Sequence, residues 1–170
     1  AWLEPASAPL EFERPQYALG EPLGQGGMGE VFAATDARLE RRLALKRLRL
    51  PPGLDPRLER RRWARFIEEA RIAGRLEHPG IVPIHDLGRD AEGRPFFTMR
   101  LVEGQNLAEL LAQRRQAPVG EWSLPRLVGV LLRVAETLAF AHHAGVIHRD
   151  LKPANVMVGR FGETYVVDWG

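Results

Sequence analysis

The first hundred residues alternate short apolar runs with turn-forming residues, a pattern typical of β-strands joined by tight connections. Five runs are candidates for strands: residues 17–23, 31–34, 43–48, 81–87 and 95–102. The polar and charged segment 35–42 fits a hairpin connection, and the turn-rich residues 89–93 join the last two runs. These patterns predict a β-rich front part.

One helix is expected in the middle of these strands. Asp55 and Pro56 offer an N-cap followed by proline at the first helical position. Apolar residues then recur at helical spacing from Trp63 to Leu76, and the sequence His-Pro-Gly at 78–80 ends the pattern.

The chain becomes mainly helical after Asn106. Residues 107–111 fit a short helix, and residues 124–144 fit a long one with a broad apolar face. Shorter strand candidates follow at 146–147, 156–158 and 165–167. Because the character changes near residues 103–104, the order of elements predicts a two-lobed α+β structure with a cleft at the joint.

Composition excludes several classes of function. The chain has 170 residues, 45% of them apolar and 27% charged, as expected of an ordinary globular domain. A net charge of only +2 does not favour nucleic-acid binding as the main function. The absence of cysteine excludes disulfides, Cys-based zinc sites and a thiol nucleophile. No apolar run approaches the ~20 residues that span a bilayer.

The start of the chain is proline-rich and has neither an initiator Met nor the apolar stretch of a signal peptide. We therefore expect residues 1–13 to be a linker or tail. The lack of cysteine is compatible with the cytoplasm, where we expect the protein to act. Tethering to a membrane through a segment outside this chain stays open.

A glycine-rich segment between the first two predicted strands is the first candidate for chemistry. Gly24, Gly26 and Gly29, followed by Val31, match the pattern G-x-G-x-x-G-x-V. Glycines permit a close backbone approach to an anion, because no Cβ intervenes. A strand follows the glycines here, which argues against a dinucleotide-binding fingerprint, in which a helix follows. A flexible hairpin turn is the alternative interpretation.

Lys46 lies in an otherwise apolar predicted strand. A buried lysine is costly unless its charge is paired, so it requires an anion. A phosphate is one candidate, and Glu69 on the predicted helix is another. The neighbouring Glu68 is expected to face solvent.

Four polar residues near the end of the chain could carry out phosphoryl transfer. Asp150 has the carboxylate needed to accept or orient the proton of an attacking hydroxyl. Lys152 can neutralise charge on a phosphoryl group, and Asn155 and Asp168 offer oxygen ligands suited to Mg²⁺. Phosphoryl transfer needs these parts because its transition state is loose and highly charged.

The stretch from His148 to Asn155, with the motif Asp168-Trp169-Gly170, resembles the catalytic loop and metal-binding motif of eukaryotic-type protein kinases. Trp169 replaces the usual Phe. Together with the glycine-rich segment and Lys46, the resemblance covers residues 17–170 and points to the serine/threonine kinases of this type found in bacteria. It implies a protein-kinase-like two-lobed α+β fold. Residues 14–103 would form an N-lobe with a five-stranded antiparallel sheet, one main helix and the hinge, and residues 104–170 a truncated, mainly helical C-lobe.

The resemblance also implies roles for individual residues. Lys46 would contact the α- and β-phosphates of ATP and pair with Glu69. Asp150 would be the catalytic base, Lys152 would assist at the γ-phosphate, and Asn155 and Asp168 would hold Mg²⁺. The remaining nucleotide-binding residues would be Gly24, Gly26 and Gly29 over the phosphates, Val31, Ala44 and Met157 around the adenine, Met99 as gatekeeper, Arg100 and Val102 through their backbone, and Asn106 near the ribose.

The function implied is ATP- and Mg²⁺-dependent phosphoryl transfer to Ser and Thr hydroxyls of protein substrates. Because the chain stops at Gly170, we expect it to be a fragment of the kinase domain. One alternative is a catalytically incompetent fragment that acts as a nucleotide-binding or protein-interaction module. A small-molecule phosphotransferase that shares the kinase core is a second alternative.

Two further features lead to hypotheses. Trp169 is larger than the usual Phe while Ala73, one turn after Glu69, is small, so Trp169 would fill the volume left by Ala73. Arginines at 57, 60–62 and 65 make the predicted helix strongly basic. A solvated helix face is the plain interpretation, and a docking surface for an acidic partner is the alternative.

Overall fold

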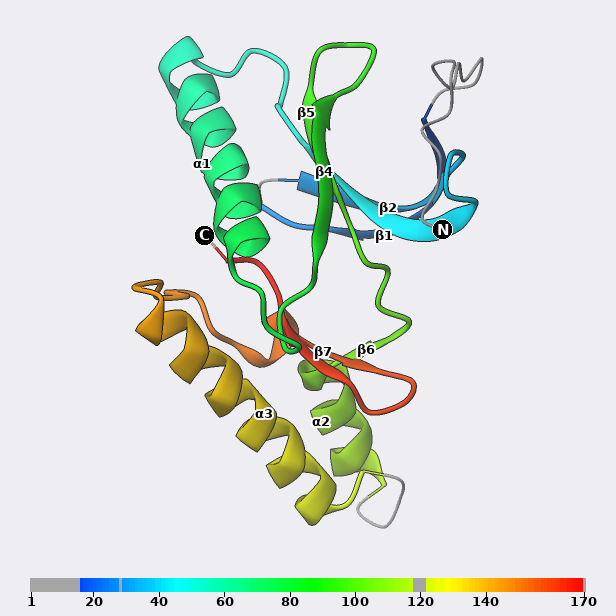
Figure 1. Cartoon of the computed structure of the whole chain (residues 1–170), viewed down its shortest axis with the longest axis vertical. Coiled ribbons are helices and arrows are strands. Elements are labelled where there is room, and N and C mark those ends of the chain that lie inside the picture. The colour runs from blue at the N-terminus through cyan, green and yellow to red at the C-terminus, as the bar shows by residue number, and fades with distance from the viewer. Residues whose placement is uncertain (1–15, 28, 118–121, 170) are drawn as a thin grey trace, which may run out of the picture.

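A computed structural model describes residues 16–27, 29–117 and 122–169 of the chain. The expected linker, residues 1–13, lies outside the described residues. Figure 1 shows two β-sheets, one packed against helix α1 and the other beside helices α2 and α3. None of the helices in the part of the chain that the structure describes is long and apolar enough to cross a membrane.

The larger sheet has five antiparallel strands in the order β1-β2-β3-β5-β4. They are β1 (Tyr17–Gln25), β2 (Gly29–Asp36), β3 (Arg41–Leu48), β4 (Ile84–Arg89) and β5 (Pro95–Met99). This confirms the predicted five-stranded antiparallel sheet. The fourth strand begins later than predicted: Ile81 instead forms a parallel bridge to Val166 of the other sheet, and Pro83 has no N–H to give to a ladder.

Helix α1 (Pro56–Arg75) packs on this sheet. Asp55 caps it, accepting hydrogen bonds from the backbone N–H groups of Arg57 and Leu58 at 2.8 and 3.3 Å. Phe66 is fully buried and its ring lies 5.1 Å from that of Phe97 on β5. This contact anchors the helix to the sheet face that also presents Lys46 of β3.

The second part of the chain contains a smaller sheet and two helices. Its strands are β6 (Gly104–Asn106), β7 (Val156–Gly159) and β8 (Thr164–Val166), and its helices are α2 (Leu107–Gln116) and α3 (Leu124–His143). A single turn of 3-10 helix, η1 (Pro153–Asn155), precedes β7. Strand β6 was not predicted because its sequence, Gly-Gln-Asn, lacks the apolar and β-branched residues typical of strands. The turn η1 was not predicted because a single turn is too short to show a helical period.

The predicted strand at residues 146–147 is wrong. Gly145 has φ 77° and donates its N–H to the carbonyl of His142 at 3.0 Å, and Val146 donates to Ala141 at 2.9 Å. These are the two bonds of a Schellman motif, which closes the C-terminal end of α3. The backbone groups that a strand would need are therefore used by the helix end.

A single hydrophobic cluster links the two parts. Leu76 and Ile81, from the segment after α1, pack with Leu107, Val134 and Trp169 from the second part. Since this cluster includes residues on both sides of residue 103, the core fixes how α1 and the two sheets face each other around the cleft described next.

Candidate functional site

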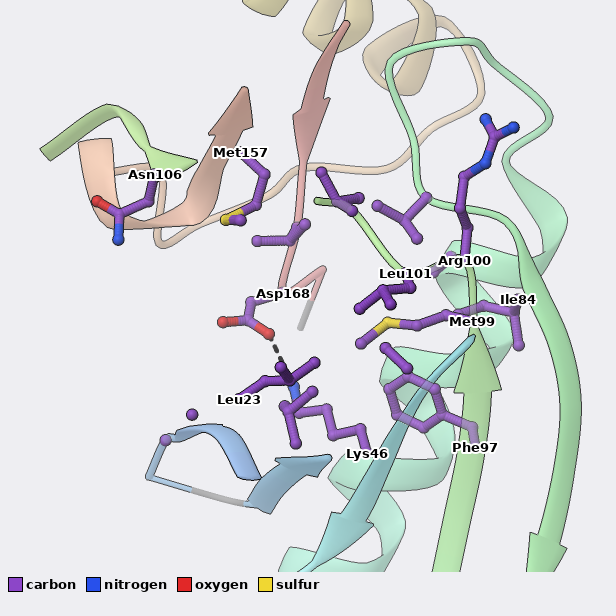
Figure 2. A pocket seen from close by; sticks show the side chains of 18 of the residues that line it. Leu23, Lys46, Ile84, Phe97, Met99, Arg100, Leu101, Asn106, Met157 and Asp168 are labelled. Carbon is purple, nitrogen blue, oxygen red and sulfur yellow. Dashed lines mark hydrogen bonds and ion pairs between the residues drawn. The ribbon is translucent and has the colours of Figure 1, made fainter. Parts of the chain in front are cut away.

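A cleft of about 610 Å³ lies between the two sheets. Its walls come from the five strands of the larger sheet, α1, β7, residues 100–104 and 166–169, and the single residues Val82, Asn106 and Ala154. Figure 2 shows Asp168 and Lys46 facing each other in this cleft, with Asn106 and Met157 on one side and Met99 and Phe97 on the other. The cleft thus occupies the joint where the sequence predicts one.

Lys46 is held between two carboxylates. Its Nζ lies 2.5 Å from Oε1 of Glu69 and 2.7 Å from Oδ1 of Asp168. Burial alone would lower the pKa of Lys46, but the charges of Glu69 and then Asp168 outweigh it, so the pKa is raised. The ammonium group is therefore charged at neutral pH although the residue is only 7% exposed.

Lys46 bonds only one of the two carboxylate oxygens of Glu69, Oε1. The other oxygen, Oε2, is buried and accepts no hydrogen bond from the described residues. Burial raises the pKa of Glu69, while the charge and hydrogen bond of Lys46 oppose that rise. Lys46 thus opposes the protonation of Glu69 that burial favours, and the two form one unit that joins α1 to β3.

A second cluster forms around Asp150. Lys152 donates from Nζ to Oδ2 of Asp150 at 2.6 Å, and Asn155 donates from Nδ2 to the backbone carbonyl of Asp150 at 2.9 Å and to Oδ2 at 3.3 Å. The hydrogen bond from Lys152, followed by its charge, lowers the pKa of Asp150. Asp150 and Lys152 are exposed, so this carboxylate is ionised and accessible.

Hydrogen bonds tie this loop to the segment before Asp168. His148 donates from Nε2 to the carbonyl of Val167 at 2.8 Å, which requires the proton on Nε2 because a carbonyl can only accept. Val167 in turn donates its N–H to the carbonyl of Asn155 at 2.9 Å. Val167 therefore connects the two candidate metal ligands, because it is bonded to Asn155 and directly precedes Asp168.

Two non-glycine residues near these clusters adopt positive φ. Arg149 has φ 66° and Asp168 has φ 61°, a region in which each such residue costs about 1–3 kcal/mol and which is concentrated at functional sites. Trp169 follows directly, is 2% exposed and donates from Nε1 to the carbonyl of Val166 at 2.9 Å. Its ring lies 4.8 Å from that of His148. Buried packing at Trp169 thus holds Asp168 in its strained conformation.

The inner part of the cleft is mainly apolar. The predicted residues Val31, Ala44, Met99 and Met157 all line it. Further apolar residues line it that sequence reasoning missed: Leu23, Val82, Ile84, Phe97, Leu101 and Val166. Each lies in or beside a strand pattern, which indicates burial but not which cavity a side chain meets.

Three of the predicted nucleotide-binding residues, Arg100, Val102 and Asn106, lie after the end of β5. Arg100 lines the cleft, but Figure 2 shows its guanidinium turned away, where NH1 donates to the hydroxyl of Tyr165 at 3.0 Å. Val102 lines the cleft as well. Asn106 lines it too, and its side-chain oxygen caps α2 by accepting from the N–H of Glu109 at 3.0 Å.

Four predicted site residues do not line this cleft: Gly29, Asp150, Lys152 and Asn155. Gly24 and Gly26 do line it. Gly29 has a steric role, because a Cβ there would lie 2.8 Å from the carbonyl oxygen of Arg47 on β3. The other three form the cluster around Asp150, in which Asp150 and Lys152 are exposed and Asn155 is buried.

Comparison with known proteins gives a consistent result. Residues 17–170 match the family model described as "Protein kinase domain". The chain is 36% identical to serine/threonine-protein kinase PknD of Protochlamydia amoebophila, over 96% of this chain and 17% of that protein. It is 42% identical to the probable serine/threonine-protein kinase SCO3848 of Streptomyces coelicolor, over 91% of this chain and 22% of that protein. The chain thus spans about a fifth of the length of these curated relatives.

A solved structure resembles the whole fold. The crystal structure of the Mycobacterium tuberculosis PknI kinase domain superposes with a TM-score of 0.69 and 28% identity. The match covers 94% of this chain and 61% of that one. The two-lobed arrangement inferred from the sequence is therefore that of the matching structure.

Proposed function

Because the chain belongs to the protein kinase domain family, we propose that it supplies the nucleotide cleft and catalytic loop of a serine/threonine protein kinase. The complete domain would transfer the γ-phosphoryl group of ATP to Ser and Thr hydroxyls of protein substrates. One observation carries the proposal: Lys46 is buried and paired with both Glu69 and Asp168 at the cleft. We place the N-lobe and hinge at residues 14–103 and the partial C-lobe at 104–170.

The cleft fits a purine nucleotide. Its volume lies within the range of about 300–1,000 Å³ typical of small-molecule sites. Val31 and Ala44 from the larger sheet and Met157 from the smaller one would lie against the two faces of a planar base. The N–H of Arg100 is bonded to the carbonyl of Pro83 at 3.1 Å, so its own carbonyl would accept from the adenine amino group. Val102 would contribute its backbone beside it.

The residues around Asp168 fit Mg²⁺. Both hydrogen bonds of the Asn155 side chain to Asp150 are donated by Nδ2, so Oδ1 would serve as a ligand together with the Asp168 carboxylate. No group of three or more His, Cys, Asp or Glu that could hold a metal occurs in the described residues. Two oxygen ligands suit Mg²⁺, which takes one or two protein ligands and completes its octahedron with phosphates and water. When bound, the ion would neutralise charge on the phosphates.

Other residues of the chain would bind the phosphates, accept the proton of the attacking hydroxyl and neutralise charge on the transferred group. Lys46 would hold the α- and β-phosphates by charge, and Gly24 and Gly26 would let the backbone approach the phosphates closely. Asp150, ionised because its pKa is lowered, would orient the attacking hydroxyl and take its proton. Lys152 would neutralise charge on the transferred group. Positioning and charge neutralisation account for most catalysis of this reaction.

Mg²⁺-dependent ATP binding tests the proposal. We expect saturable binding to the wild-type chain, at least tenfold weaker binding to Lys46→Met and Asp168→Asn, and unchanged binding to Glu68→Gln. Glu68 is a matched control because it neighbours Glu69 on α1 but is exposed. A folded chain that binds no ATP would instead support an interaction module. Phosphorylation of a generic protein substrate by the full-length protein would separate a protein kinase from a small-molecule phosphotransferase.

A further inference from the structure

The outer face of α1 is covered with arginine. Phe66 and Ala70 bury the inner face against the sheet, and Figure 1 shows the helix at the edge of the molecule beside β4 and β5. At 100° per residue, positions on the opposite face point to solvent. Six arginines on that side are exposed: Arg57, Arg60, Arg61, Arg65, Arg71 and Arg75.

Their charge is not compensated within the fold. None of the six forms an ion pair with a residue that the structure describes. Residues 49–75 carry eight arginines and four acids, a net charge of +4, while the whole chain has +2. The remainder of the chain therefore has a net charge of −2. The excess of positive over negative charge is therefore confined to one helix and the segment before it.

This arrangement opposes the stability of the helix. The N-terminal end of a helix is electropositive and favours acids, yet Arg57, Arg60 and Arg61 lie in its first turns and Glu59 is the only acid in the first turn. Arg57, Arg61 and Arg65 are spaced by four residues, a like-charge spacing that repels. Of the six arginines, only Arg75, in the last turn, lies where the helix dipole favours a cation. A local rule that is broken without a gain in folding indicates a function for the surface.

We propose that the outer face of α1 is a docking surface for an acidic polypeptide segment. Charge complementarity identifies the partner, since a row of unpaired arginines attracts carboxylates and fixes them by bidentate hydrogen bonds. Arg57, Arg61 and Arg65 recur about every 6 Å along the axis. In an extended peptide, alternate side chains recur at about 6.8 Å. The segment that fits is therefore extended, with an acid at every second position.

Other polyanions fit this surface less well. A helix that lies on a membrane must bury its apolar face in lipid, but the apolar face of α1 is already packed against β5 through Phe66 and Phe97. Nucleic acid is attracted by a broad positive field, whereas the chain outside residues 49–75 is net negative. A short acidic segment would contact only the arginines of α1, so it needs no wider positive surface.

The test uses a fluorescein-labelled 12-residue peptide with Asp at alternate positions, and its Asn analogue as the uncharged control. The variant Arg57→Glu/Arg61→Glu removes two arginines from the row and adds two acids. These changes put acids into the first turns of α1, where they favour the helix, so loss of folding would not explain loss of binding. Arg38→Glu/Arg115→Glu is the control with the same change in net charge, at exposed positions outside α1.

We expect the Asp peptide to bind the wild-type chain and the control variant, and to bind Arg57→Glu/Arg61→Glu at least about tenfold more weakly. Binding should also weaken with added salt. Equal affinity for both variants, or equal affinity for the Asn peptide, would overturn the proposal. Tighter binding of single-stranded oligonucleotide or of vesicles containing an anionic lipid, lost in the α1 variant, would overturn it in favour of that polyanion. ATP binding should be the same in all variants, because these arginines lie away from the cleft.

Discussion

The two lysines of the chain each pair with a carboxylate at nearly the same distance, but in very different surroundings. Lys46 and Glu69 lie 2.5 Å apart with side chains 9% and 6% exposed, whereas Lys152 and Asp150 lie 2.6 Å apart with side chains 52% and 63% exposed. Distance therefore does not distinguish the two pairs. Burial does, because breaking a buried pair leaves a charge without solvent, and breaking an exposed pair lets water replace the lost partner.

The difference in burial gives the two pairs different roles within one site. The buried pair joins α1 to β3 at the cleft, so it contributes to the stability of the fold and, in the proposed function, would also serve nucleotide binding. The exposed pair adds little to folding but keeps the Asp150 carboxylate ionised and accessible. Three substitutions, Lys46→Met, Ala73→Leu and Lys152→Ala, test this separation and the packing of α1, from the largest expected effect to the smallest.

The largest effect is expected for Lys46→Met. The substitution leaves Glu69 buried without its partner, which should lower the free energy of unfolding by about 3–5 kcal/mol. Urea denaturation followed by circular dichroism measures the change. The double variant Lys46→Met/Glu69→Leu should recover most of the stability while ATP binding stays lost. If the double variant were as unstable as the single one, the buried charge would not be the cause.

The loss in Lys46→Met should depend on pH. Burial raises the pKa of Glu69, and without the lysine nothing opposes that rise. A raised carboxyl pKa favours the protonated form in the folded state, so the penalty is smallest near and below the ordinary pKa of 4.5 and grows as pH rises. We expect the variant to be closer to wild type in stability at pH 5 than at pH 8. A gap that is constant over this range would contradict this account.

A smaller effect is expected for Ala73→Leu, which tests how α1 is seated. Ala73 packs against the cluster that contains Trp169, and both residues line the cleft. If Trp169 fills the volume left by Ala73, the larger side chain overpacks the site and costs about 1–3 kcal/mol of unfolding free energy. The double variant Ala73→Leu/Trp169→Phe should lose less than the sum of the single variants. Additive losses would mean that the two side chains do not share that volume.

Lys152→Ala should leave the midpoint of urea unfolding unchanged, because the pair that it breaks is exposed. Phosphorylation of a generic substrate by the full-length protein should nevertheless fall, since Lys152 would act on the transferred phosphoryl group. Lys152→Arg is the matched control and should retain part of the activity. A clear drop in stability with normal activity would reverse the assignment of this pair.

The smallest change is in the titration of Asp150. Its pKa is lowered, first by the hydrogen bond from Lys152, so the carboxylate stays ionised to a lower pH than its ordinary value of 3.8. Because the folded pKa is the lower one, the small stabilisation from this interaction is present above pH 3.8 and is lost as pH falls through the folded pKa. In a carbon-detected NMR titration, Lys152→Ala should raise the pKa of Asp150. An unchanged titration would show that Lys152 does not control this carboxylate.

The sequence predicted most of the fold because its local signals agree. Asp55 with Pro56 predicted the start of α1, and short apolar runs between turn-forming residues predicted all five strands of the larger sheet. The failures have local causes too. Residues 146–147 were predicted as a strand, but Gly145 and Val146 close the end of α3. Strand β6 consists of Gly, Gln and Asn, which do not favour strands.

By itself the sequence determined the kinds of chemistry available. It offered a lysine that needs an anion, an aspartate that can act as a base, two oxygen ligands, and a family resemblance at the right spacing. These follow from residue types and from distances along the chain, which a sequence states directly.

Only the tertiary structure decided which residues meet. It added Asp168, 122 residues away, to Glu69, the partner of Lys46 that the sequence had already suggested, and it exposed Asp150 and Lys152 while burying Asn155. It also assigned Gly29 to close strand packing. The physical reason is burial: the effective strength of a charge and the space around a side chain depend on neighbours brought together by packing, which no local pattern contains.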